Sequence, residues 1–129
     1  MANLRVHSDR LEVQLTRAEK LLAAHGRDIV VPRELIRTAT ITHDPWVWIR
    51  GIRAPGTYLP RTLAVGTWRN HGGTDFIVVK SKRPAVVLEL DNDERNRYSR
   101  LVVSTAQAAE LIASLQLEQR TDGTEPAQV

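Results

Sequence analysis

The sequence predicts a mainly β protein of the α+β class, in which about seven short strands form a curved antiparallel sheet or small barrel. Aliphatic and polar residues alternate in several short segments, which is the pattern of half-buried strands. Clusters of Gly, Pro, Asn and Asp separate these segments, as expected for tight connections. One clear amphipathic helix pattern lies near the C-terminus, where we expect it to cap the sheet.

The first expected strand covers residues 11–15, where aliphatic and polar side chains alternate. A helix follows directly, because Thr16 and Glu19 have the spacing of a capping box, in which each side chain satisfies a backbone N–H of the other residue. Apolar positions then recur at helical spacing until Gly26, a typical stop. The first strand therefore leads into a short helix.

The middle of the chain predicts further extended segments with one helical turn between them. Residues 28–32 form a short strand that ends at a proline, and residues 34–44 are rich in β-branched side chains. Residues 45–50 predict a helical turn, with Pro45 at its first position. Pro55-Gly56 predicts a tight turn, because proline fixes φ for the second turn position and glycine accepts a positive φ at the third.

From Thr62 onward the alternation resumes and predicts four strands, which end near residues 70, 80, 90 and 104. The terminal helix then carries an apolar stripe at helical spacing, formed by Ala108, Leu111, Ile112 and Leu115. Residues 119–129 are polar and have no periodicity, so we expect a disordered tail. Residues 1–118 are expected to form a single domain.

The composition excludes several classes of protein. The 129 residues include no cysteine, which rules out disulfides, thiolate metal sites and cysteine nucleophiles. The N-terminus lacks the apolar run of a signal peptide, and no segment is apolar for the length of a membrane span. We therefore expect a cytoplasmic protein, either free or peripheral at the membrane.

Charge is distributed unevenly along the chain. Residues 45–83 contain seven Lys or Arg and one Asp, a net charge of +6, whereas residues 84–129 contain four basic and eight acidic residues, a net charge of −4. A basic segment of this kind attracts phosphates or an acidic partner. The alternative is a domain that shows charges of one sign on each side.

No motif for catalysis, metal binding or cofactor binding is present. The glycine-rich stretch from residue 51 to 73 contains neither the Walker A pattern nor the dinucleotide-binding fingerprint, and no pair of histidines has zinc-ligand spacing. The serines lack a nucleophile-elbow context. His43-Asp44 is the one adjacent imidazole–carboxylate pair, and we interpret it as a loop histidine beside a helix cap. The sequence thus predicts a non-enzymatic protein without metal or cofactor.

The candidate binding residues lie in the basic segment. They are four arginines and one tryptophan: Arg50, Arg53, Arg61, Arg69 and Trp48. The planar guanidinium forks of the arginines would bind a phosphate or carboxylate if the loop brought them together. The alternative is a set of solvated arginines, or arginines paired with Asp44 and Asp75. Two tryptophans that are two positions apart cannot share one helical face, so an exposed Trp46 or Trp48 would mark a contact surface. The alternative is that both pack as core at the end of the barrel.

The order of elements resembles the pleckstrin-homology-like (PH-like) barrel, and more narrowly a group of small uncharacterised actinobacterial proteins of that superfold. The segments that carry the likeness include "DPWVWIRGIRAPGTYLP", "AVGTW", "GGTDFIVV" and "RPAVVLEL". The helix after the first strand departs from the general superfold. Relatives within the superfold bind phosphoinositides, phosphopeptides or protein segments, so the resemblance implies a binding module.

These observations favour a non-enzymatic interaction module that binds a protein partner, or an anionic group such as a lipid or phosphate, through its basic loop region. A basic β-surface with tryptophans is also the pattern of single-stranded nucleic-acid binders, although the acidic C-terminal third would repel the phosphate backbone. A small enzyme with its site in the barrel mouth is the weaker alternative. Self-association through a sheet edge or the terminal helix stays open.

Overall fold

The computed structural model describes residues 3–23, 28–71, 73–94, 96–105, 108–115 and 119–121. Strands dominate, as predicted. The elements in chain order are β1 (Asn3–Val6), β2 (Arg10–Gln14), α1 (Arg17–Ala23), β3 (Ile29–Pro32), the 3₁₀ turn η1 (Arg33–Leu35), β4 (Ile36–Thr42), the 3₁₀ turn η2 (Pro45–Trp48), β5 (Ile52–Leu59), β6 (Leu63–Asn70), β7 (Gly73–Lys80), β8 (Ala85–Leu90), β9 (Arg100–Ser104), α2 (Ala108–Leu115) and β10 (Gln119–Thr121).

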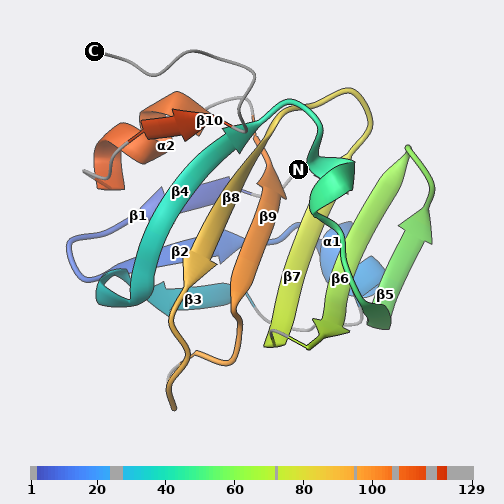
Figure 1. The fold of residues 1–129 in the computed structure, drawn as a ribbon, viewed down its shortest axis with the longest axis horizontal. Helices are drawn as coiled ribbons and strands as arrows, with labels where there is room; N and C mark the ends of the chain where they lie inside the picture. Colours follow the sequence, from blue (N-terminus) through green and yellow to red (C-terminus); the bar gives the residue numbers. More distant parts are fainter. Residues whose placement is uncertain are drawn as a thin grey trace.

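The strands form two sheets rather than a closed barrel, which corrects the expectation of a small barrel. A three-stranded sheet has the order β1-β2-β3, and a seven-stranded sheet has the order β10-β4-β8-β9-β7-β6-β5. The small sheet lies across one face of the large one, and β5 forms an outer border of the large sheet (Figure 1). The helix α2 contacts β1, β4 and β10 at the other side of the molecule.

The expected antiparallel order fails in two pairs of strands: β10 pairs with β4 in parallel, and β9 pairs with β7 in parallel. β9 lies between β7 and β8, although it follows both in the chain, and it pairs with β7 in parallel and with β8 antiparallel. The charged connector after Leu90 folds the chain back, so that Arg100 at the start of β9 lies between Glu89 near the end of β8 and Asp75 near the start of β7. Alternation in the sequence predicts which residues form strands, but it does not predict which strands become neighbours.

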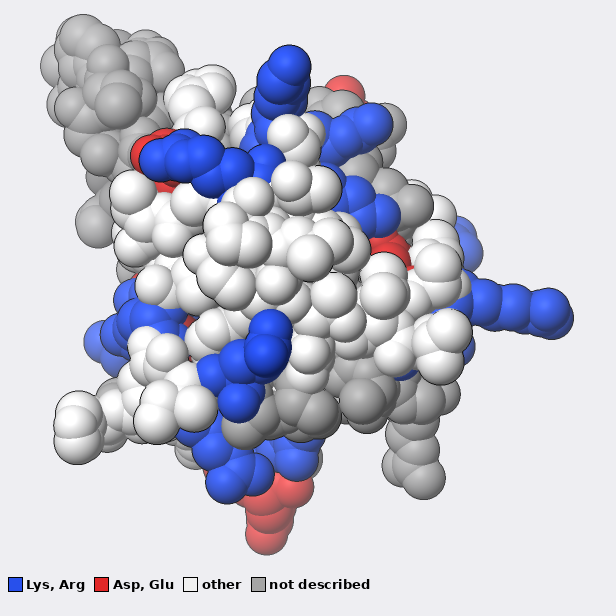
Figure 2. Space-filling model, turned by 90° about the vertical axis from the view of Figure 1, so that its right-hand side faces the viewer, with Lys and Arg blue, Asp and Glu red and all other residues white. Residues whose placement is uncertain are grey.

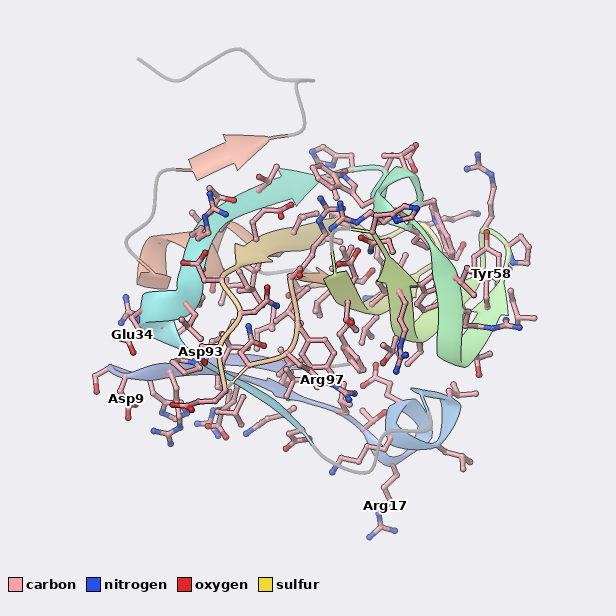
Figure 3. The ribbon with its side chains drawn as sticks, turned by 60° about the horizontal axis from the view of Figure 1, so that its bottom comes forward. Asp9, Arg17, Glu34, Tyr58, Asp93 and Arg97 are labelled. Atoms are coloured by element: carbon pink, nitrogen blue, oxygen red, sulfur yellow. The ribbon has the colours of Figure 1, made fainter. Side chains whose placement is uncertain are left out.

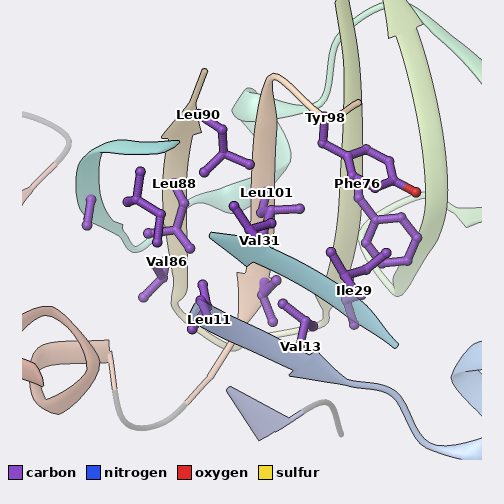
Figure 4. Close-up of a cluster of buried hydrophobic side chains, with 14 of the residues drawn as sticks. Leu11, Val13, Ile29, Val31, Phe76, Val86, Leu88, Leu90, Tyr98 and Leu101 are labelled. Atoms are coloured by element: carbon purple, nitrogen blue, oxygen red, sulfur yellow. The ribbon is translucent and has the colours of Figure 1, made fainter. Parts of the chain in front are cut away.

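The main core fills the space between the two sheets. Aliphatic residues of β2 and β3, such as Leu11 and Val31, face Phe76, Leu88 and Leu101 of the large sheet, and all are buried (Figure 4). The ring of Tyr98 packs edge-on against Phe76, with 5.7 Å between the ring centroids. Leu111 and Ile112 of α2 belong to the same cluster, so these two residues of the predicted apolar stripe pack on the β-layer.

A second apolar cluster lies on the opposite face of the large sheet. Ile77, Val87 and Val102 are fully buried there. Trp46 and Trp48 of η2, together with Ile49, pack against this cluster. The predicted helical turn after Pro45 is therefore confirmed as a 3₁₀ turn, and it covers sheet surface that would otherwise face water.

The helix α1 begins at the predicted capping box. The Thr16 N–H donates to Oε1 of Glu19 at 2.9 Å, and the Glu19 N–H donates to Oγ1 of Thr16 at 3.1 Å. Oε2 of Glu19 also forms an ion pair with Nζ of Lys80 on β7, at 2.9 Å. Burial would raise the pKa of Glu19, but the bonds from Lys80 and Thr16 lower it overall. This single side chain fixes both the start of α1 and its place beside the sheet.

Two local expectations differ from the structure. Pro55-Gly56 is not a turn but part of β5, and the turn comes later, where the Thr62 N–H donates to the Leu59 carbonyl at 2.9 Å. Residues 119–121, expected in the disordered tail, form β10, and residues 122–129 lie outside the described residues. The division into one domain of residues 1–118 stays a prediction. Among the described residues, no helix has the length and apolar content needed to cross a membrane.

Candidate functional site

The border strand β5 presents exposed apolar side chains to solvent. The exposed fractions are 75% for Ile52, 40% for Tyr58 and 52% for Leu59, which are large values for such residues. Seen from this side, the molecule shows a broad uncharged area with Lys and Arg around it and few acidic groups (Figure 2). We call the exposed side chains of Ile52, Tyr58 and Leu59, with Arg53 and Arg61, the β5 surface. Tyr58 and Arg53 lie on one face of the sheet and Ile52 and Leu59 on the other, so these side chains line both sides of the border strand. Apolar side chains exposed along one border are typical of contact surfaces.

The shape of β5 depends on a pair of glycines. Gly56 is opposite Gly66 of β6, and its φ of 150° lies in the region that favours glycine. A Cβ atom on Gly56 would lie 2.8 Å from the Cα of Gly66, so a larger residue would push the two strands apart. The register between β5 and β6 also shifts between Arg53 and Gly56, which marks a bulge in β5.

Three aromatic rings gather over this glycine pair. Tyr58 lies 6.4 Å from Trp46 and 6.2 Å from Trp68, measured between ring centroids, and it meets Trp68 edge-on. Trp68 is buried and Trp46 half-buried, so Tyr58 is the member of the group that faces solvent. Rings in such tilted arrangements hold each other in place, which gives Tyr58 a fixed orientation at the surface.

A row of side chains crosses the same face of the large sheet. Register partners in neighbouring strands are, in order, Arg53, Trp68, Asp75, Arg100 and Glu89. Such partners point to the same side of a sheet. Nε of Arg100 donates to Oε1 of Glu89 at 2.8 Å, and Asp75 is paired with an arginine from outside the row. Both acids of the row are thus neutralised, and Arg53 at the border adds an uncompensated positive charge.

Arg50, the first of the predicted binding residues, serves the interior of the fold. Its Nε donates to Oδ2 of Asp75 at 2.9 Å, and Asp75 is fully buried. Nδ2 of Asn70 donates to the same Asp75 oxygen at 3.3 Å. The hydrogen bond to Asp75 raises the pKa of Arg50 against the opposing effect of burial. This is the pairing with Asp75 that the sequence offered as the alternative to ligand binding.

The other three predicted arginines do not meet at one point. Arg53 pairs in register with Trp68, whereas Arg69 is opposite Ile52 and so lies on the other face of the sheet. Arg61 lies at the far end of β5, in the turn before β6, with a φ of 57°. All three are exposed, and none forms an ion pair with another described residue.

Trp48, the predicted exposed tryptophan, is half-buried. The guanidinium carbon of Arg100 lies 5.0 Å from its ring centroid, which is a cation–π contact. The Trp48 ring thus covers the arginine that pairs with Glu89. Tyr58 is the exposed aromatic residue that the sequence analysis missed. The alternation of Thr57, Tyr58 and Leu59 was the available signal, but the Pro-Gly pair before it indicated a turn and hid the strand.

Elsewhere in the described part of the chain, the candidate places are an open hollow and the His43-Asp44 pair. An open hollow of about 500 Å³ lies beside η1 and is lined by residues of both charges: Ser8, Asp9, Arg10, Val30, Pro32, Arg33 and Glu34. His43 and Asp44 are both exposed, and the Asp44 N–H donates to Oγ1 of Thr42. Within the described ranges, no three His, Asp or Glu side chains come together as a metal site would require.

Comparisons with models of protein families, with curated proteins and with solved structures gave no match. The geometry of the β5 surface is therefore the basis for the function proposed below.

Proposed function

We propose that this protein is an interaction module that binds an acidic segment of a protein partner at the β5 surface. The observation that carries the proposal is the combination of exposed Ile52, Tyr58 and Leu59 with arginines that have no acidic partner among the described residues. Aromatic residues and arginine are enriched where proteins meet, because they combine apolar contact area with directional hydrogen bonds.

The spread of the arginines favours a protein segment over a compact anion. Arg53 and Arg61 lie at opposite ends of β5, and Arg69 lies on the other face. One phosphate group reaches only donors that converge on it, whereas an extended segment with several carboxylates reaches donors along a strand. Exposed aliphatic side chains also offer little to a free phosphate or to a nucleotide base, which stacks on aromatic rings.

The charge of the opposite side is consistent with an acidic partner at β5. Asp9, Glu34 and Asp93 lie at the side of the molecule opposite Tyr58 (Figure 3). Acids on that side lie beside arginines, since Nη1 of Arg10 donates to Oδ1 of Asp9 at 2.9 Å, whereas Arg53 and Arg61 have no acidic partner among the described residues. A partner that carries carboxylates is therefore attracted to the β5 side.

A competition experiment tests the proposal. The protein is panned against a random ten-residue peptide library, and the enriched peptides are then competed with a 20-nucleotide oligothymidine, inositol hexakisphosphate and anionic phosphatidylserine vesicles. We expect enriched peptides with net negative charge and apolar residues, which lose affinity when Tyr58→Ser is introduced. If no peptide is enriched, the proposed protein partner is wrong. If one competitor displaces the peptides and also binds the protein directly, that class of ligand takes the place of the protein partner.

Membership of the PH-like superfold also belongs to this proposal. The quoted segments around residues 45–68 and the helix near the C-terminus support it. In this chain β7 and β9 pair in parallel. If the small proteins that the sequence resembles share its topology, an experimental structure of one of them must contain the same parallel pair.

A further inference from the structure

β5 leaves one border of the large sheet open. Among the described strands it pairs with β6 alone, because it stands last in the strand order. In a border strand, the N–H and C=O groups of alternate residues face outward, and a strand of another chain can form hydrogen bonds with them. The geometry therefore permits strand addition at β5.

The two halves of β5 differ in how well they are protected. Pro55 offers no N–H, and the bulge after Arg53 breaks the regular spacing of the backbone groups. Natural sheets protect their borders with such features. The second half, Gly56–Leu59, pairs regularly with β6 and contains no proline, bulge or charged side chain. The open border is thus confined to these four residues.

Side chains around this open half offer contacts on both faces and at both ends. Tyr58 shares its face with Trp68, while Thr57 and Leu59 lie on the face next to α1, where Oγ1 of Thr57 donates to the Leu22 carbonyl at 2.8 Å. A bound strand, whose side chains also alternate, would contact Tyr58 on one face and Leu59 on the other. Arg53 and Arg61 stand at the two ends.

We infer that the partner segment binds as an added β-strand along Gly56–Leu59, with acidic side chains at both of its ends. This inference rests on the proposed function. Arg53 and Leu59 are six positions apart along β5, which is about 20 Å in an extended strand and less where β5 bulges, and Arg61 lies just beyond Leu59 in the turn before β6. A segment with acidic residues some six to eight positions apart, around a short apolar core, therefore matches the border in length and charge.

A second copy of the chain fits this border less well. Antiparallel pairing of two β5 strands about the open half would place Arg53 of one copy near Arg61 of the other. Like charges that face each other across paired strands are destabilising. The same two arginines that disfavour self-pairing attract an acidic strand, so they select for a different partner.

Three synthetic peptides test the binding mode on the full chain. The parent has six alternating valine and threonine residues between two aspartates at each end, and two further peptides carry backbone N-methyl groups on alternate residues, in the two possible phases. We expect the parent to protect amide protons of Gly56–Leu59 from hydrogen exchange. In one methylated peptide the N–H groups that face β5 are blocked, so its affinity should fall by about tenfold. In the other peptide the methyl groups face away from β5, so it should bind like the parent.

Two variants test the end contacts. Arg61→Gly should weaken binding of the parent about threefold at low salt, whereas Lys82→Gly, which also removes a cation at a positive φ but in the turn after β7, should leave it unchanged. Equal affinity of all three peptides would overturn the added strand and leave the proposed function standing. Absence of parent binding, together with no acidic enrichment in the library experiment, would overturn both. A chain that is already dimeric by light scattering and loses this state in Tyr58→Lys would assign the border to self-pairing.

Discussion

The central strands and the border strand of the large sheet use similar residues for different purposes. β7, β8 and β9 are covered on both faces, and Phe76, Val87 and Val102 are fully buried. β5 has one neighbouring strand among the described elements, and Ile52 and Leu59 face solvent. Apolar side chains in the centre stabilise the fold, whereas those at the border leave apolar area available for a partner. The difference predicts that substitutions in the two regions act on different measurements.

The largest effect on stability is expected from the centre. Phe76→Ala should lower the free energy of unfolding by about 3–5 kcal/mol, because it removes a buried ring and leaves a cavity. Ile52→Ala at the border should change it by less than about 0.5 kcal/mol, because that side chain is already exposed. Urea denaturation followed by tryptophan fluorescence measures both. A comparable loss in the two variants would contradict the distinction between centre and border.

The next effect concerns the ion pair that joins the two regions. Arg50→Met should lower the free energy of unfolding by about 2–3 kcal/mol, because the carboxylate of the buried Asp75 loses its charged partner. Asp75→Asn should have a smaller effect, because the Arg50 side chain is 39% exposed and water can solvate it. The double variant should recover part of the loss. If both single variants were equally destabilising, solvent access to Arg50 would not matter.

A smaller, pH-dependent effect is expected at Glu19. Its folded-state pKa lies below the ordinary value of 4.5, so its contribution is present above that pH and is lost as the pH falls through the lower folded value. Glu19→Gln should lower the free energy of unfolding by about 1–2 kcal/mol at pH 7. The difference from wild type should shrink in acid denaturation series below pH 4.5. A constant difference across these pH values would exclude the charged form as the source.

The smallest effect has the opposite sign and belongs to the border. Arg61 adopts a φ of 57°, which disfavours any residue with a Cβ atom. Arg61→Gly should raise the free energy of unfolding by about 0.5–1 kcal/mol, once the greater flexibility of glycine in the unfolded state is deducted. Lys82 adopts a φ of 58°, so Lys82→Gly should raise the free energy of unfolding by a similar amount. Thermal unfolding measures both variants. Stabilisation together with weaker peptide binding would show that the arginine serves recognition at the expense of the fold.

The sequence predicts much of the local structure and little of the site. The capping box of Thr16 and Glu19 and the 3₁₀ turn after Pro45 follow from interactions between residues close in the chain, and the structure contains both. The insertion of β9 and the border position of β5 depend on contacts between distant segments, which alternation does not encode. Arg50 looked like a ligand contact because its partner, Asp75, is 25 positions away.

The position of β9 also has a consequence for synthesis of the chain. Until residues 100–104 have left the ribosome, the strands β7 and β8 have no strand between them, and each exposes a row of backbone N–H and C=O groups that β9 pairs with in the finished fold. A nascent chain in that state is prone to capture by other unfinished chains, so a pause in translation just before this segment should lower the yield of native protein.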